Sequence, residues 1–224
     1  MPARGRWQEA SASISTRLAN RRDGVPFMPS GFDLGMSERD VDEWLSLVRE
    51  FLRILAKRKK QQFDRRVSVG DLLTERSDNA AAYGFGEGTT MYDNVLVRGD
   101  VRVGRNTWIG PGCILDGSGG VLEIGDWCSI SAGAQIYTHH TVNRSISLGE
   151  KPIDCASTSI GHGVYIGPNA IVQMGVTIGD KAIIGANSLV NRDIPRGAKA
   201  FGSPARVQGE QKLSLARRQL RNEG

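Results

Sequence analysis

An aliphatic residue occupies every sixth position of this chain between residues 160 and 190. Glycine directly follows four members of this run, which comprises Ile160, Ile166, Val172, Ile178, Ile184 and Val190. A period of six is neither the 3.6 of a helix nor the 2.0 of a strand. It suits a chain that coils into a triangular prism, in which each flat face takes six residues and one aliphatic side chain points to the axis. The repeat therefore predicts a parallel β-helix.

The same step of six occurs earlier in the chain, in two further runs. They comprise Met91, Val97, Val103, Ile109 and Leu115, and then Ile124, Ile130 and Ile136. A glycine-containing insertion at 116–123 shifts the phase between them, and a long break at 137–159 precedes the third run. Three faces make one coil of about 18 residues, so the runs predict roughly four to five coils around one apolar axis.

The residues before the repeat favour a helix rather than further coils. Ser37 is a helix N-cap, acidic residues follow it, and lysines and an arginine end the segment at 57–60, which suits a helix over about 38–62. Apolar residues from Val41 to Leu55 recur at spacings of three and four. We expect this stripe to pack on the main domain or on another subunit, with a basic amphipathic membrane contact as the alternative.

Four regions are expected along the chain. They are a flexible tail at 1–36, a helical extension at 37–80, the β-helix at 81–209, and a tail or short helix at 210–224. The net charge is +5, and the basic residues gather near both ends and at 57–66. Solvated surface, an anionic cosubstrate or a loose membrane contact would all explain them. Nucleic acid is not expected as a partner, because no aromatic residues interleave with the basic runs.

The three cysteines, Cys113, Cys128 and Cys155, match no zinc or disulfide spacing. They are interpreted as small buried residues in a reducing compartment, and a cytoplasmic location is expected. No segment approaches the 18 consecutive apolar residues of a spanning helix, and the N-terminus lacks an apolar signal core. The arginine- and serine-rich start superficially resembles an organellar transit peptide, but a disordered tail is the simpler interpretation.

Four motifs add a family resemblance to the repeat. They are Gly-Phe-Gly-Glu-Gly-Thr at 84–89, Ile-Ser-Ala-Gly-Ala-Gln-Ile-Tyr-Thr-His at 130–139, Gly-Val-Thr-Ile-Gly-Asp at 175–180 and Gly-Ser-Pro-Ala-Arg at 202–206. Through them the chain resembles the hexapeptide-repeat acyltransferase superfamily, in its sugar and xenobiotic O-acetyltransferase branch, from about Tyr83 to Val207. The resemblance implies a left-handed coil, acetyl-CoA as cosubstrate, no required metal, and a homotrimer with active sites between subunits.

Histidine carries the expected chemistry. In similar enzymes the catalytic histidine follows Tyr-Thr at this point, which selects His139, at the mouth of the 137–159 loop, as the general base. Imidazole titrates near neutrality, so it can take a proton from a hydroxyl that attacks a thioester. The family pattern Thr-His-Asp-Thr-Val has histidine in place of aspartate here. His140 is therefore a substrate-contact candidate. Asp116, at the Asp116-Gly117 turn after the first run of the repeat, could also contact an acceptor hydroxyl. The resemblance further implies that a loop acidic residue orients the histidine or the substrate, and that position falls on Asp154, with Glu150 as a nearby candidate.

The resemblance also implies a cofactor surface along the C-terminal coils. Tyr165 and Pro168 correspond to positions that contact pantetheine, and Ala186 to one that hydrogen-bonds through its backbone. Asn191, Arg192 and Arg206 fall where relatives meet the nucleotide and the phosphates, and the arginines are suited to phosphate. The third histidine, His162, occupies a variable repeat position and is expected to be an outward-facing turn residue.

The leading hypothesis is an acetyl-CoA-dependent O-acetyltransferase that acts on a sugar, polysaccharide-related or other small hydroxylated acceptor. N-acetylation of an amino sugar stays open, because the same base can serve an amine. A carbonic anhydrase on the same coil is disfavoured, because His139, His140 and His162 lack the spacing of its three zinc ligands. A non-catalytic scaffold is the remaining alternative. The acceptor itself is not predicted, since hexapeptide coils serve unrelated acceptors on similar cores.

Overall fold

The computed structural model describes residues 37–210. The expected flexible tail at 1–36 and the expected C-terminal tail or helix beyond 210 therefore lie outside the described residues. The chain divides into two compact units, residues 1–50 and 51–224, and the boundary falls within its long helix. The second unit contains the coil and every candidate site residue.

The long helix is α2 (Glu38–Phe63). Its N-terminus is a reciprocal cap, because the Asp40 N–H donates to Ser37 Oγ at 3.3 Å and the Ser37 N–H donates to Asp40 Oδ2 at 2.8 Å. Hydrogen bonds from the Ser37 side chain and backbone lower the pKa of Asp40. The predicted helix and its cap are confirmed. Within residues 37–210, no helix is long and apolar enough to cross a membrane.

Two short helices, α3 (Val69–Leu73) and α4 (Arg76–Ala81), connect α2 to the coil. A buried carboxylate holds this connection. Asp71 accepts hydrogen bonds from Arg76 Nη2 at 2.9 Å and from the Asp93 N–H at 3.2 Å. The Arg76 guanidinium also lies 3.4 Å from the centre of the Tyr92 ring. The helices are thus joined to the start of the coil by charge-assisted bonds.

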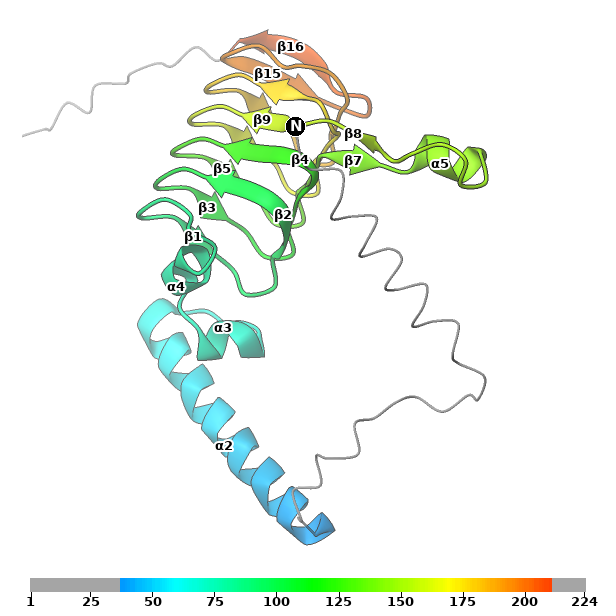
Figure 1. The fold of residues 1–224 in the computed structure, drawn as a ribbon. Helices are drawn as coiled ribbons and strands as arrows, with labels where there is room; N and C mark the ends of the chain where they lie inside the picture. Colours follow the sequence, from blue (N-terminus) through cyan, green and yellow to red (C-terminus); the bar gives the residue numbers. More distant parts are fainter. Residues whose placement is uncertain (1–36, 211–224) are drawn as a thin grey trace, which may run out of the picture. The chain divides into compact units, whose positions relative to one another are not determined.

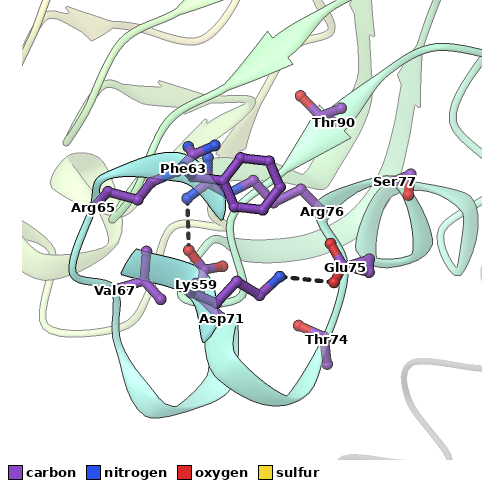
Figure 2. A pocket seen from close by; sticks show the side chains of 10 residues that line it. All are labelled: Lys59, Phe63, Arg65, Val67, Asp71, Thr74, Glu75, Arg76, Ser77 and Thr90. Atoms are coloured by element: carbon purple, nitrogen blue, oxygen red, sulfur yellow. Dashed lines mark hydrogen bonds and ion pairs between the residues drawn. The ribbon is translucent and has the colours of Figure 1, made fainter. Parts of the chain in front are cut away.

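A cavity of about 180 Å³ lies beside this connection (Figure 2). Its cations already have partners: Lys59 Nζ lies 2.7 Å from Glu75 Oε1, and the Arg65 guanidinium lies 4.7 Å from the centre of the Phe63 ring. We interpret the cavity as part of this structural joint.

The rest of the described chain coils into three parallel faces (Figure 1). The first face comprises β1 (Thr90–Met91), β3 (Trp108–Ile109), β5 (Ser129–Ile130), β10 (Tyr165–Ile166), β13 (Ile183–Ile184) and β15 (Ala198–Phe201), followed by the antiparallel β16 (Arg206–Glu210). The second comprises β6 (Gln135–Tyr137), β11 (Ile171–Val172) and β14 (Leu189–Val190), and the third β9 (Thr158–Ile160) and β12 (Thr177–Ile178). The long strands β2 (Leu96–Val103) and β4 (Ile114–Ile124) contribute to both the second and the third face.

The aliphatic residues of the repeat form the axis of the coil. Ile130, Ile166 and Ile184 occupy the same register in consecutive strands of the first face, and all three are fully buried. Small or polar residues that lie two positions before a repeat residue are also buried, as are Cys113 before Leu115 and Cys128 before Ile130. The predicted parallel β-helix with an N-terminal helical extension is confirmed. The prediction that all three cysteines are buried is wrong for Cys155, because it lies on an excursion from the coil and is exposed.

Replacing Ile184 by alanine should lower the free energy of unfolding by about 2–5 kcal/mol, because it leaves a cavity at the axis that neighbouring coils cannot fill. The matched control is Ile183→Ala, one residue earlier on the outer side of the same strand, where the side chain is only partly buried. Urea denaturation measures both. Equal losses in the two variants would contradict an axis built from every sixth residue.

The break at 137–159 is a hairpin that projects from the side of the coil (Figure 1). Its strands β7 (His139–His140) and β8 (Asp154–Cys155) pair antiparallel, and α5 (Val142–Ile146) lies in the loop between them. The Ala156 N–H donates to the Thr138 carbonyl at 2.9 Å, which closes the base of the hairpin. The excursion therefore starts and ends at one corner of the coil.

Candidate active site

The insertion at 116–123 brings a buried carboxylate to the corner where this hairpin begins. Asp116 lies within β4, its side chain is 1% exposed, and its Oδ1 accepts hydrogen bonds from both the N–H and the hydroxyl of Ser118. Arg98 Nη1 lies 3.8 Å from Asp116 Oδ2. Burial raises the pKa of Asp116, but the bonds from Ser118 and the nearby His139 and Arg98 outweigh it and hold the pKa below its ordinary value. Asp116 is therefore an anion at neutral pH.

His139 lies against this carboxylate. Its Nδ1 is 3.2 Å from Ser118 Oγ and 3.6 Å from Asp116 Oδ1, and its side chain is 23% exposed. Thr138, fully buried, holds it there by donating to the Asp116 carbonyl at 2.8 Å and accepting from the Gly119 N–H at 3.0 Å. A Cβ on Gly119 would lie 2.5 Å from His139 Cβ, so only glycine allows this close approach.

The hydrogen bonds assign the neutral tautomer of His139. The single hydroxyl proton of Ser118 is donated to Asp116, so Ser118 Oγ must accept from His139. Nδ1 therefore carries the proton, and Nε2 is left unprotonated. The negative charge of Asp116 lies where it stabilises the ring once Nε2 takes a proton. The three side chains form a relay suited to general base chemistry.

The structure places Asp154 beside His140 rather than His139. His140 and Asp154 face each other across the β7–β8 ladder, with Nδ1 and Oδ2 3.4 Å apart, and neither atom has a hydrogen-bond partner within the described residues. Asn143 Nδ2 donates to Asp154 Oδ1 at 3.1 Å. The exposed Glu150 lies in the turn after α5, and its carboxylate pairs with neither histidine in the part of the chain that is described. It is thus Asp116, predicted as a substrate contact, that meets His139.

The six candidate cofactor residues are all exposed and lie on two corners and one face of the coil. Pro168 and Ala186 occupy one corner in consecutive coils, where the Asn187 N–H donates to the Pro168 carbonyl at 2.9 Å. Tyr165 lies on the first face, and Arg206 starts β16 beside β15. Asn191 and Arg192 follow β14, which stacks through β11 on β6, so they share the corner that carries His139.

His162 is exposed in a turn, as predicted, and its Nδ1 accepts from the Asp126 N–H at 3.0 Å. The motifs do not predict a role for Ser118, although the Asp116-Gly117-Ser118 turn is a signal for it, because aspartate side chains bond the backbone two residues on. Among residues 37–210 no cluster of three histidine, cysteine or carboxylate side chains is arranged to hold a metal ion.

The comparisons with known proteins agree with the repeat. Residues 157–192 match the family model described as bacterial transferase hexapeptide (six repeats). A comparison with curated protein sequences found no match. Among solved structures, a hexapeptide-repeat-containing acetyltransferase from Vibrio cholerae is 25% identical, with 73% of this chain and 92% of that chain covered and a TM-score of 0.54.

Two other solved structures have similar folds. The same Vibrio cholerae acetyltransferase complexed with acetyl-CoA gives 25% identity and a TM-score of 0.54, over 73% of this chain and 88% of that one. An N-acyltransferase from Bacillus cereus, in complex with dTDP and 3-hydroxybutyryl-CoA, is 22% identical, with coverages of 57% and 72% and a TM-score of 0.50. Fold and repeat together define a hexapeptide-repeat β-helix protein. The resemblance to the hexapeptide-repeat acyltransferase superfamily is confirmed.

Proposed function

We propose that this protein is an acetyl-CoA-dependent O-acetyltransferase, with His139 Nε2 as the general base. The observation that carries the proposal is the His139–Ser118–Asp116 relay at the mouth of the hairpin, which leaves Nε2 unprotonated. The fold supports the cosubstrate, because the similar Vibrio cholerae acetyltransferase has been solved with acetyl-CoA. A cytoplasmic location is consistent with that cosubstrate. We expect the acceptor to be a sugar or a polysaccharide-related molecule.

In the proposed reaction, Nε2 takes the proton of the acceptor hydroxyl as its oxygen bonds to the thioester carbonyl carbon. Asp116 stabilises the positive imidazole ring that results, and Ser118 keeps the ring oriented. The tetrahedral intermediate then breaks its carbon–sulfur bond. The proton on Nε2 passes to the departing thiolate, and the relay returns to its starting state.

The distribution of the cofactor candidates supports a homotrimer. Within one subunit, Pro168 and Ala186 lie at a different corner from Asn191 and Arg192, and the second face separates the two sets. One extended cosubstrate therefore meets both sets most simply between two subunits, where one corner of a prism approaches a different corner of its neighbour. Light scattering should give the mass of a trimer. A monomer at micromolar concentration would contradict both the trimer and the active site shared between subunits.

A coupled assay tests the activity and its alternatives. Release of free thiol from acetyl-CoA is followed against a panel of sugars, amino sugars, nucleotide sugars and polysaccharides. Thiol release with hydroxyl acceptors supports O-acetylation, whereas release confined to amino sugars would replace it with N-acetylation. Calorimetry with acetyl-CoA addresses the scaffold alternative, since a full chain that does not bind acetyl-CoA cannot be this enzyme.

A further inference from the structure

A tryptophan occupies a strained turn at the corner between the third and first faces of the coil. The residues stacked at this corner all have positive φ, and the others are Gly88, Asn106, Gly163, Lys181 and Gly197. Trp127, with φ of 59°, is the one aromatic residue among them, and it is 70% exposed. A positive φ strains a bulky residue, whereas glycine or asparagine adopts this conformation more readily. The strain and the exposure together point to a use for the ring.

The ring lines a hollow in the surface. A hollow of about 360 Å³ is formed by Trp127 together with Glu87, Arg105 and Asn106. A second hollow, of about 490 Å³, lies over the third face and is lined in part by Arg102, Glu123, Ser159 and Asp180. Asp126 lines both, so the two hollows adjoin at this residue.

One strand connects this surface to the candidate active site. β4 carries Asp116 before the corner at His139, and its later residues Glu123 and Ile124 line the second hollow. Gly119 approaches His139, and Asp126 is seven residues further along the chain. Seven extended residues span at most about 23 Å. The surface between His139 and Trp127 is thus a short path along a single face of the coil.

The chemistry of this path selects a class of ligand. The two guanidiniums along it are paired with carboxylates, Arg102 with Glu123 and Arg105 with Asp126, so it presents no free positive charge for a phosphate or a polyanion. Carboxylate, amide and hydroxyl groups instead suit a ligand with many hydroxyls, and a flat exposed indole suits the C–H face of a sugar ring. We infer that the Trp127 surface binds the distal units of an extended saccharide whose acceptor hydroxyl lies at His139.

Binding of the saccharide does not depend on catalysis, whereas its role as the acceptor rests on the proposed function. The test is an array of linear hexasaccharides of glucose, galactose, mannose, rhamnose and N-acetylglucosamine with the corresponding monosaccharides, probed with the full chain. Wild-type protein should bind one of these hexasaccharides more tightly than it binds the corresponding monosaccharide. Trp127→Asn, which suits the positive φ and so should fold, should bind that hexasaccharide at least about tenfold more weakly, whereas Trp127→Phe keeps a ring and should bind within about threefold of wild type.

The outcomes separate this inference from the proposed function. Trp127-dependent binding without thiol release from acetyl-CoA would refute the transferase but retain the saccharide surface. Thiol release with no hexasaccharide bound, or with Trp127→Asn binding as tightly as wild type, would overturn the saccharide surface alone. Light scattering is the last control, because a change of oligomeric mass in Trp127→Asn would assign the ring to a subunit contact instead.

Discussion

Replacing His139 by alanine is expected to lower kcat for acetyl transfer by about 10²–10⁴-fold, the usual contribution of a positioned general base. The expected loss is large because Nε2 is the nitrogen that the Ser118 and Asp116 bonds leave unprotonated. Affinity for acetyl-CoA should change little, since in the proposed reaction His139 takes its proton from the acceptor hydroxyl rather than binding the cosubstrate. Thiol release measures kcat, and calorimetry measures the binding of acetyl-CoA.

The adjacent histidine provides the comparison for this variant. His140 pairs with Asp154 on the hairpin, so His140→Ala should act mainly on the KM for the acceptor and retain most of kcat. If His139→Ala keeps more than about a tenth of wild-type turnover, His139 is not the base. A collapse of kcat in His140→Ala alone would transfer that role to the His140–Asp154 pair.

Replacing Asp116 by asparagine is expected to lower kcat by about 10²-fold. The variant keeps the volume of the side chain and an oxygen that can accept from Ser118, but it removes the negative charge 3.6 Å from His139 Nδ1. That charge matters most after the ring has taken a proton, so kcat should fall while the KM for acetyl-CoA stays nearly constant. Steady-state kinetics separate the two constants, and an equal change in both would indicate a general structural defect.

The same variant has a signature in stability against pH. The pKa of Asp116 lies below its ordinary value of 3.8, so folding favours the ionised carboxylate. This contribution is fully present above about pH 4 and is lost as the pH falls through the lowered pKa of the folded state. The difference in unfolding free energy between wild type and Asp116→Asn should therefore be largest near neutrality and shrink in acid. A difference that grows as the pH falls would contradict the ionised assignment.

Residues in the candidate site differ in how far the sequence could predict them. The motif at 130–139 predicts His139, and the end of a run of the repeat predicts Asp116 as a candidate. Their relation was not predicted, because it depends on how the insertion at 116–123 stacks on the next coil through Thr138. Asp154 was expected to orient His139, but the antiparallel register of β7 and β8 places it opposite His140.

The sequence by itself determined the fold, because a period of six recurs through fourteen coil positions and each apolar residue has only the axis in which to be buried. It also determined where the coil is interrupted, and so where reactive side chains leave the regular faces. The tertiary structure alone decided which side chains meet. Ser118 and Gly119, in β4, both lie against His139 because successive coils stack on one another. Such contacts join residues about one coil apart, and a local sequence pattern carries no information on that register.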